Sequence, residues 1–324
     1  MLNGFICEQD RPRRMHAASA EDLRGAVWID LVSATDEEVR LVQEATGLAV
    51  PSQAEIDEIE TSSRLATRNG VLYLSMPMLS MADGPHGVAV GFILSPDRLI
   101  TVRFAQSQSF ENFATQLPRG ESASPDAVHI FVGLLEAIID RQADALEGIR
   151  ADLERISHRI FRVGVSGGGS KDEDLRLRRT LSDLGTIGDL ISHIRDTQVA
   201  AARIVPYVTL VADSWLPRDI RARLRTLRRD IESVSDFNTH LNDKLQFMLD
   251  ATLGFINIAQ NNLMKVMTIT SVAGIPPVLV AGIYGMNFKV MPELDWAWGY
   301  AWGLGWIVIS TLIPIAIFRW RKWI

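Results

Sequence analysis

VMTITSVAGIPPVLVAGIYGM (residues 266–286) decides the fold of this chain, because no charged residue interrupts it. A second uncharged stretch, GYAWGLGWIVISTLIPIAIF, follows at residues 299–318. A helix rises 1.5 Å per residue, so about 20 apolar residues span the roughly 30 Å hydrocarbon core of a bilayer. Two neighbouring stretches of this kind are more typical of membrane spans than of buried helices in a soluble protein. Residues 266–324 are therefore predicted to form a two-helix transmembrane hairpin.

Aromatic and basic residues orient this hairpin. Tryptophan and tyrosine flank the second stretch, as they do at membrane–water interfaces: Trp296, Trp298, Tyr300, Trp302, Trp320 and Trp323. The second stretch is followed by Arg319, Arg321 and Lys322. The first is preceded by Lys265, whereas the loop between the two holds only Lys289. Because cytoplasmic loops carry the excess of Lys and Arg, we expect a multi-pass protein of the cell (inner) membrane with both termini in the cytoplasm.

The composition argues against several classes of protein. The formal net charge is −6, so wholesale binding of nucleic acid is not expected. A single cysteine, Cys7, excludes a disulfide framework within the chain. The sequence contains no Walker loop, nucleophile elbow or HExxH motif, and its six histidines show no metal-ligand spacing. We therefore expect no enzyme, no organic cofactor and no nucleic-acid partner.

Residues 1–120 show the pattern of a compact α/β domain. Strand-like apolar stretches occur together with an amphipathic helical segment: VWIDLV (27–32), DEEVRLVQEATGL (36–48), GVLYLSMPML (70–79), GVAVGFIL (87–94) and LITVRF (99–104). The turn residues SPDR (95–98) favour a hairpin between the last two strands. Mixed strands and helices within one compact segment predict an α/β fold.

Residues 121–265 are predicted to be helical. Ser124 and Pro125 are typical of the start of a helix. A Gly/Ser-rich linker, GVSGGGSKDED (164–174), is expected to end that helix.

A second helical block is expected to run to about residue 204, where Pro206 and Pro217 frame a break. From about residue 219 to the first apolar stretch, no proline occurs and helical periodicity is sustained. A helix of this length predicts a stalk that packs against other helices, including those of other subunits.

The first apolar stretch carries a stripe of mixed polarity along one helix face. Its members recur at alternating spacings of three and four: Asn261, Met264, Thr268, Ser271, Ile275, Val278 and Gly282. Such a stripe is expected to face protein or water rather than lipid. Alternatively, Thr268 and Ser271 only bond their own helix backbone. One hairpin cannot enclose a pore, so a transporter of this design requires a closed ring of subunits.

The loop between the apolar stretches carries the most specific motif. YGMNF (284–288) followed by MPEL (291–294) resembles the signature of the CorA family of magnesium channels, and the resemblance extends over essentially the whole chain. NNLMKVMTIT (261–270), GFINIAQN (254–261) and the VWIDLV segment fit the same family. The resemblance implies a funnel-shaped homopentamer with a cytoplasmic α/β domain, a long stalk helix and a pore lined by the first span. It also implies passive, potential-driven influx of Mg²⁺, often with Co²⁺ and Ni²⁺, gated by intracellular Mg²⁺.

The resemblance also implies roles for single residues. It places ion selectivity at Gly285, Met286 and Asn287, with Asn287 as an outer ring that receives the ion. It puts a narrow cytoplasmic gate near Asn261, Met264 and Met267, and the lining of the middle of the pore at Ile275 and Val278. Some relatives have threonine at the position of Val278, which leaves a second ion site in this pore in doubt.

The chemistry of Mg²⁺ agrees with a ring of amides. Mg²⁺ is small and loses its water reluctantly, so amide oxygens that accept hydrogen bonds from its waters can recognise the hydrated ion. A neutral amide also lets the ion leave again. Glu293 and Asp295 would concentrate cations at the outer mouth, unless they only solvate the loop. Asp230, on the stalk, resembles a position that senses cytoplasmic Mg²⁺ in relatives, although a solvated or salt-bridged stalk residue is equally compatible.

Three other functions compete with a magnesium channel. A proton-coupled Zn²⁺ transporter of the related ZntB type shares the architecture but usually lacks MPEL, so the intact MPEL favours magnesium. A membrane-anchored enzyme lacks support in the motifs. A purely structural anchor would need neither the polar stripe nor the polar outer turn.

Overall fold

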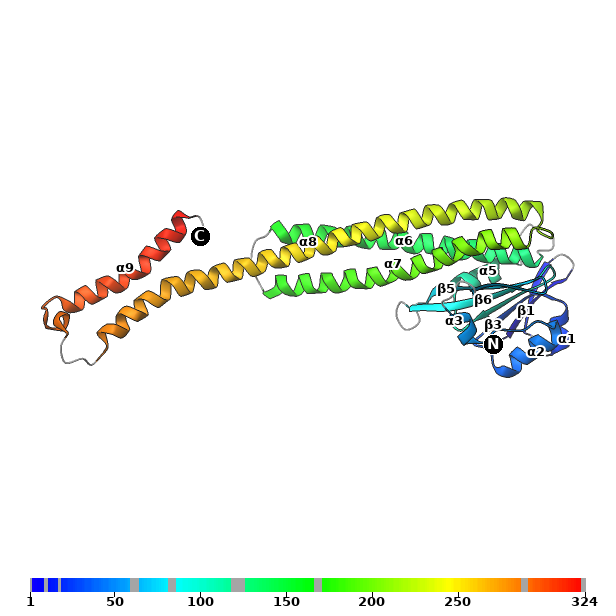
Figure 1. The fold of residues 1–324 in the computed structure, drawn as a ribbon, viewed down its shortest axis with the longest axis horizontal. Coiled ribbons are helices and arrows are strands. Elements are labelled where there is room, and N and C mark those ends of the chain that lie inside the picture. Colours follow the sequence, from blue (N-terminus) through cyan, green and yellow to red (C-terminus); the bar gives the residue numbers. More distant parts are fainter. Residues whose placement is uncertain are drawn as a thin grey trace. The chain divides into compact units, whose positions relative to one another are not determined.

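The computed structural model describes residues 2–8, 11–16, 19–58, 64–80, 86–117, 126–165, 171–286 and 291–321 (Figure 1). The chain divides into two compact units. The first comprises Met1–His158 and Ser182–Met248, and the second comprises Arg159–Leu181 and Leu249–Ile324. The predicted domains are consecutive segments with boundaries at residues 120 and 265, whereas each of these units combines two separate segments of the chain. The domain boundaries therefore remain a prediction.

The first unit is built on one mixed β-sheet in the order β2-β1-β3-β7-β6-β5-β4. Its strands are β1 (Leu2–Glu8), β2 (Arg11–His16), β3 (Ala26–Val32), β4 (Leu65–Arg68), β5 (Val71–Ser80), β6 (His86–Leu94) and β7 (Leu99–Arg103). Only β3 and β7 pair in parallel, and the other neighbours are antiparallel. The predicted strands at 27–32, 70–79 and 87–94 are confirmed, as is the hairpin of β6 and β7 around Ser95–Arg98.

Strands β1, β2 and β4 were not predicted. The edge strand β2 has the sequence RPRRMH, whose charges and proline give no apolar alternation. Charged residues and proline are common on sheet edges because they discourage pairing with another chain. Their strand conformation here depends on pairing with β1, which the sequence pattern does not reveal.

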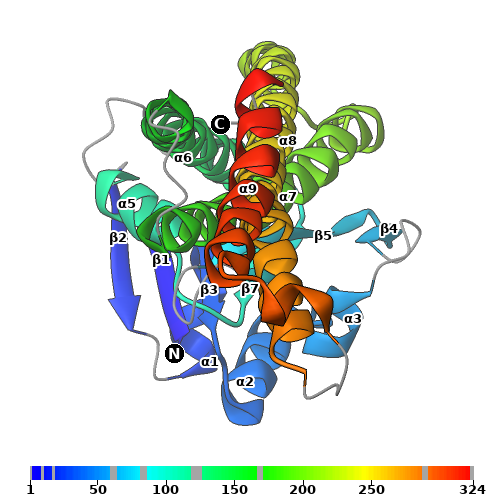
Figure 2. The same ribbon diagram turned by 90° about the vertical axis from the view of Figure 1, so that its left-hand side faces the viewer.

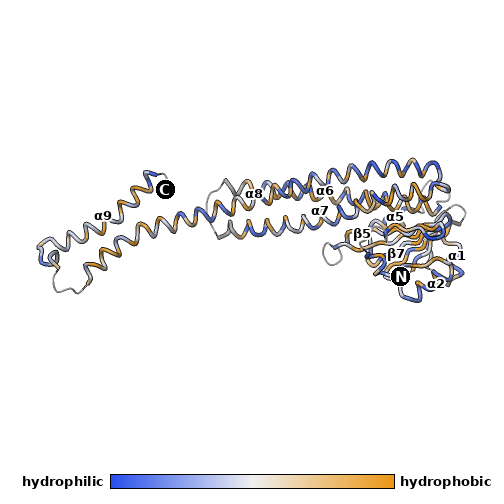
Figure 3. Tube along the Cα trace, in the orientation of Figure 1, coloured by the Kyte–Doolittle hydropathy of each residue, from blue (hydrophilic) through white to orange (hydrophobic). Residues whose placement is uncertain are grey.

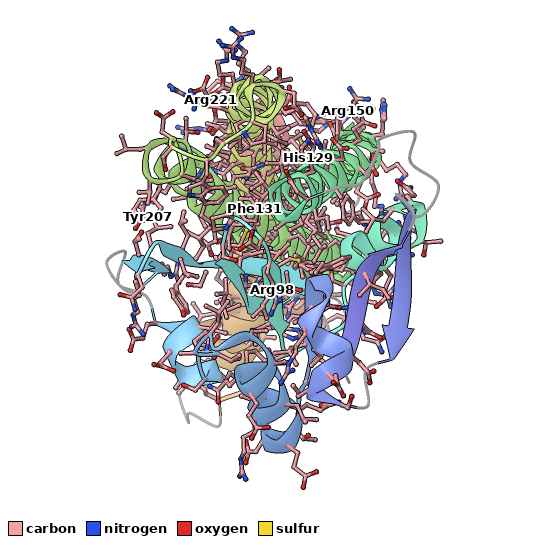
Figure 4. The ribbon with its side chains drawn as sticks, turned by 90° about the vertical axis from the view of Figure 1, so that its right-hand side faces the viewer. Arg98, His129, Phe131, Arg150, Tyr207 and Arg221 are labelled. Atoms are coloured by element: carbon pink, nitrogen blue, oxygen red, sulfur yellow. The ribbon has the colours of Figure 1, made fainter. Side chains whose placement is uncertain are left out.

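Helices cover both faces of this sheet (Figure 4). One face carries the short helices α1 (Ala20–Arg24), α2 (Asp36–Thr46) and α3 (Gln53–Asp57), each started by a capping box. The other face carries α5 (Gln108–Gln116) and the long helices. These are α6 (Ala127–Val165), α7 (Lys171–Val211) and α8 (Arg218–Tyr284). Figure 2 looks along the long helices and shows them as neighbouring rods in the first unit.

The start of α6 differs slightly from the prediction. The helix begins at Ala127, and the carboxylate of Asp126 accepts a hydrogen bond from the backbone N–H of His129 at 2.9 Å. Asp126 therefore caps one of the free amides at this end. The predicted cap, Ser124, and the predicted first helical residue, Pro125, lie outside the described residues.

The predicted break between Pro206 and Pro217 is confirmed, because α7 ends at Val211 and α8 begins at Arg218. Its predicted start near residue 204 is wrong, because α7 continues through Pro206 to Val211. A proline inside a helix costs about 3 kcal/mol because one backbone hydrogen bond is lost. Here Ile204, Val205 and Val208 bury almost completely against the sheet. Burial of each such side chain stabilises the fold by about 1.5–3 kcal/mol, so the tertiary contacts outweigh the tendency of proline to end a helix. The predicted continuous helix into the first apolar stretch is confirmed by α8.

A buried ion pair ties β3 to β7. The guanidinium of Arg103 donates to Asp30 through Nε at 3.1 Å and through Nη2 at 2.8 Å, and both residues are buried. Thr101 donates to the same carboxylate at 2.8 Å and receives a hydrogen bond from Trp28 Nε1 at 3.0 Å. Burial alone would lower the pKa of Arg103, but the hydrogen bonds and charge of Asp30 raise it above its usual range. The pair is therefore held charged inside the core.

The second unit contains the two apolar runs. They lie in α8 and in α9 (Gly299–Trp320), where the most apolar windows have a mean hydropathy of 1.9 and are not buried within the chain (Figure 3). The short 3₁₀-helix η2 (Pro292–Asp295) precedes α9. Helix α8 runs through Pro276 and Pro277 without ending. These elements confirm the predicted fold class, an N-terminal α/β domain with a long helix and two C-terminal apolar helices.

Candidate pore-lining site

The predicted stripe lies on α8 and is open to its surroundings in a single chain. Met264 is 61% exposed, Ile275 64% and Val278 71%. Met267, the other predicted gate residue, is 58% exposed. Apolar side chains this exposed need lipid or other protein chains around them. The single chain therefore presents the stripe without enclosing it.

A groove runs along this face of the helix. Its volume is about 710 Å³ and its lining comes from α8 and the turn that follows it: Thr270, Ser271, Gly274, Ile275, Val278, Leu279, Gly282, Ile283 and Met286. Four members of the predicted stripe are among these residues, namely Ser271, Ile275, Val278 and Gly282. A groove on one helix becomes a channel only when further helices close it.

The hydroxyl groups of the stripe differ in their hydrogen bonding. The hydroxyl of Thr268 donates to the carbonyl of Met264 at 2.8 Å, which is the alternative left open by the sequence. Thr270 donates to Val266 at 2.9 Å in the same way. Ser271 has no hydrogen-bond partner among the described residues, and it lines the groove. Within the stripe, the Ser271 hydroxyl is therefore available for a hydrogen bond to water or to another chain.

Two backbone hydrogen bonds close the turn that follows α8. The backbone N–H of Gly285 donates to Ala281 at 3.0 Å, and that of Met286 donates to Ile283 at 3.2 Å. The helix ends at Tyr284, whose ring lies 3.9 Å from the position of a Cβ on Gly303, so α8 and α9 approach each other here. Asn287 and Lys289 lie outside the described residues.

The structure describes some of the acidic and aromatic side chains of the outer loop. Asp295 ends η2 and is exposed, whereas the side chain of Glu293 lies outside the described residues. Trp302 makes edge-to-face contacts with Trp296 and Trp306, with ring centroids 6.4 and 6.0 Å apart. Trp306 was not predicted to belong to this aromatic cluster, although its spacing of four from Trp302 on a helix could have indicated it.

Asp230, the predicted regulatory residue, lies on the exposed side of α8 in the first unit. It makes no ion pair or hydrogen bond among the residues that the structure describes. Its neighbours on α6 are acidic. Burial raises the pKa of Asp140, and the nearby charges of Glu136, Asp144 and Asp230 raise it further. These α6 residues could not be chosen from the sequence, because the electrostatic interaction joins segments about 90 positions apart.

This acidic patch is not a complete metal site in one chain. Arg223 already neutralises Glu136, with Nε 3.1 Å from the carboxylate. Among the described residues, no group of three or more His, Cys, Asp or Glu side chains is placed to hold a metal ion. Closely spaced carboxylates nevertheless attract cations, because a bound cation relieves their mutual repulsion.

Known proteins match this chain over most or all of its length. The family model described as CorA-like Mg²⁺ transporter protein matches residues 24–321. The magnesium transport protein CorA of Escherichia coli K12 is 33% identical over 326 residues, covering 100% of both chains. The CorA protein of Salmonella typhimurium is 32% identical with the same coverage.

Solved structures agree on the fold. The complete CorA magnesium transporter of Methanocaldococcus jannaschii superposes with a TM-score of 0.73 at 20% identity, covering 100% of this chain and 99% of the other. Full-length CmaX gives a TM-score of 0.71 at 16% identity, covering 99% and 97%. The cytoplasmic domain of ZntB from Vibrio parahaemolyticus gives 0.50 at 11% identity, covering 80% and 96%. The resemblance inferred from YGMNF and MPEL is thus confirmed, and the chain belongs to the family of CorA-like Mg²⁺ transporter proteins.

Proposed function

We propose that this chain forms a homopentameric channel in the cell inner membrane that admits Mg²⁺ passively, driven by the membrane potential. The observation that carries the proposal is the α8 groove, because it continues from the predicted pore stripe to Met286 in the turn that follows the helix. The magnesium transport proteins that match over the full length support Mg²⁺ as the ion. Co²⁺ and Ni²⁺ are proposed as further cargo.

The groove explains why several copies are required. One α8 supplies one wall, so a closed ring of identical walls would surround an axis lined by Ile275 and Val278. Apolar rings of this kind hold little water and gate by dewetting. Asn261, Met264 and Met267 would form the narrow gate at the cytoplasmic end, with Thr268 and Ser271 between the gate and the apolar rings. Both termini would then be cytoplasmic, with the GMN loop (285–297) outside.

Selectivity is assigned to the outer turn. Gly285 and Met286 would shape the turn that presents Asn287, and the ring of amides would accept hydrogen bonds from the water shell of Mg²⁺. Glu293 and Asp295 would raise the local concentration of cations. This division separates attraction by charge from recognition by a neutral amide.

Transport of Mg²⁺ is tested with purified protein in liposomes loaded with a Mg²⁺ indicator. We expect Mg²⁺ to enter when a potassium diffusion potential makes the interior negative, and entry to stop when that potential is removed. The alternative is proton-coupled Zn²⁺ transport, because the cytoplasmic domain of ZntB has a similar fold. Zn²⁺ uptake that requires a proton gradient, without Mg²⁺ uptake, would overturn the magnesium proposal.

The ring is tested by native mass spectrometry of the detergent-solubilised protein. The chain has a mass of 36.0 kDa, and we expect a single species of about five times that mass. A monomeric species at the concentration that supports flux would contradict a pore built from several α8 helices.

Regulation by intracellular Mg²⁺ is assigned to Asp230 with Asp140 as its neighbour. Asp230→Asn is expected to raise the internal Mg²⁺ concentration that closes the channel about fivefold, since one exposed charge interaction is worth up to about 1 kcal/mol. Asp236→Asn, which removes another exposed carboxylate of α8, is the matched control and should not change closure. Equal closure curves for the two variants would exclude Asp230 from sensing.

The raised pKa of Asp140 gives a second readout for the same patch. Folding raises the pKa of the Asp140 carboxyl. At a pH above the folded pKa, its ionised form therefore lowers the free energy of unfolding, and this loss disappears as the pH falls through the folded pKa. Asp140→Asn should therefore raise the melting temperature in Mg²⁺-free neutral buffer by up to about 3 °C. It should also reduce the stabilisation that added Mg²⁺ gives to the parent protein.

A further inference from the structure

Three amide side chains are buried in the core between the long helices of the first unit. Gln142 comes from α6, Gln198 from α7 and Asn238 from α8, and they are 6%, 1% and 2% exposed. Amides this deeply buried are uncommon in a helical core. We refer to Gln142, Gln198 and Asn238 as the amide layer.

The amide layer interrupts an otherwise apolar sequence of core positions on each helix. The apolar cluster against the sheet extends to Ile139 on α6, Ala200 on α7 and Val234 on α8. The next buried apolar residues on the same helices are Leu146, Ile194 and Leu241, which lie outside that cluster. Gln142 and Asn238 lie three or four positions from both neighbours, and Gln198 lies two positions from Ala200 and four from Ile194. The ion pairs His129–Asp219 and Glu154–Lys244 align α6 with α8 at an offset of 90 positions. Gln142 therefore lies about 9 Å along the helix axis from the level of Asn238, and the amide layer spans more than one turn.

Hydrogen bonds fix the orientation of two of these amides. Asn238 Nδ2 donates to the backbone carbonyl of Ile191 at 3.3 Å and to Gln198 Oε1 at 3.1 Å, so α8 is bonded to α7 at two points. Reversing the Asn238 amide would set its oxygen against the carbonyl of Ile191. Reversing Gln198 would likewise set its NH₂ group against that of Asn238.

This bonded arrangement leaves buried atoms unpaired. Gln142 Oε1, Gln198 Nε2 and Asn238 Oδ1 have no partner among the described residues. Unpaired buried polar atoms destabilise a fold, and leucine at these positions would fill the space without that cost. Stability alone therefore does not account for the amide layer.

Apolar helix interfaces tolerate sliding because successive core layers resemble one another. A polar residue at a single core position removes this degeneracy, since its hydrogen bonds form in one register only. Moving α8 by one turn, about 5.4 Å, would carry Asn238 away from both Ile191 and Gln198. It would also bring an apolar residue of α8, Val234 or Leu241, to Gln198.

We propose that the amide layer, through the bonded pair of Gln198 and Asn238, fixes the axial register of α8 against α7. This role does not depend on which ion the chain carries. It predicts that removing all three amides leaves a folded helical core whose α8 no longer occupies one register.

Disulfide trapping between α7 and α8 tests the proposal in the full-length protein in detergent. A Cβ on Gly188 would lie 3.3 Å from Leu245 Cδ2, so Gly188→Cys with Leu245→Cys reports the native register. Gly188→Cys paired with Leu241→Cys or with Met248→Cys reports α8 moved by about one turn. All pairs are made with Cys7→Ser, and only cross-links within one chain are scored, by migration on non-reducing gels.

With the amide layer intact, we expect only the native pair to cross-link. In the Gln142→Leu, Gln198→Leu, Asn238→Leu triple variant, at least one shifted pair should cross-link to a tenth or more of the native yield. Thr197→Val is the matched control, because the Thr197 hydroxyl bonds the carbonyl of His193 on its own helix. It should leave the cross-linking pattern unchanged.

A triple variant that cross-links only through the native pair would overturn the proposal. If the triple variant does not fold, Gln198→Leu with Asn238→Leu removes the bonded pair and leaves Gln142 in place. The same appearance of shifted cross-links is then expected, and their absence in this folded double variant would equally overturn the proposal.

Discussion

Replacing Asn287 by alanine is expected to reduce Mg²⁺ influx more than about 100-fold while the pentamer stays intact. Each amide would contribute a hydrogen bond worth about 0.5–1.5 kcal/mol to the hydrated ion. Five copies would together contribute about 3–7 kcal/mol, and each 1.4 kcal/mol is a factor of about 10 in occupancy. The liposome assay measures the loss, and native mass spectrometry checks the oligomer.

Asn262→Ala is the matched control for this substitution. Asn262 is an exposed asparagine on α8 that lies one position outside the pore stripe. Its removal should change influx less than about twofold, as expected for a surface substitution. An Asn287→Ala pentamer that conducts like the parent would show that the ion is selected elsewhere on the turn or in the pore.

Replacing Arg103 by methionine is expected to destabilise the first unit by about 3–5 kcal/mol. The substitution leaves the Asp30 carboxylate buried without its two guanidinium bonds. Thr101 would remain as a donor, but a hydroxyl does not balance a buried charge. For a unit of this size the melting temperature should fall by roughly 6–20 °C, measured by thermal unfolding in detergent.

Two variants separate this effect from a general loss of arginine. Arg228→Met removes an exposed arginine that pairs with Glu232 on the same helix, and it should cost less than about 1 kcal/mol. Asp30→Leu combined with Arg103→Met removes both buried charges and should recover most of the lost stability. Equal melting temperatures for Arg103→Met and Arg228→Met would mean that Arg103 does not stabilise the core.

Several elements were predictable because their signal is local. The strands at 27–32 and 87–94 are short apolar runs between turn residues, and α2 has both a capping box and helical periodicity. Other elements depended on distant partners. Strand β2 exists through β1, and α7 continues past Pro206 because its neighbours bury against the sheet.

The candidate site divides in the same way. The α8 stripe could be located from spacing alone, because side chains three and four apart share a helix face. The acidic neighbours of Asp230 could not, because α6 and α8 are brought together only by folding. The amide layer was missed for the same reason, since three polar residues on separate helices show no shared pattern in sequence.

The sequence by itself determined the two C-terminal apolar helices, the position of the α8 stripe and the family, because each depends on consecutive residues or on helical spacing. The tertiary structure decided the order of the strands, the partner of Arg103, the surroundings of Asp230 and the layer that bonds α8 to α7. These features join residues about 40 to 90 positions apart. Their contacts follow from how sheet and helix faces bury together, and no local pattern encodes which distant face that is.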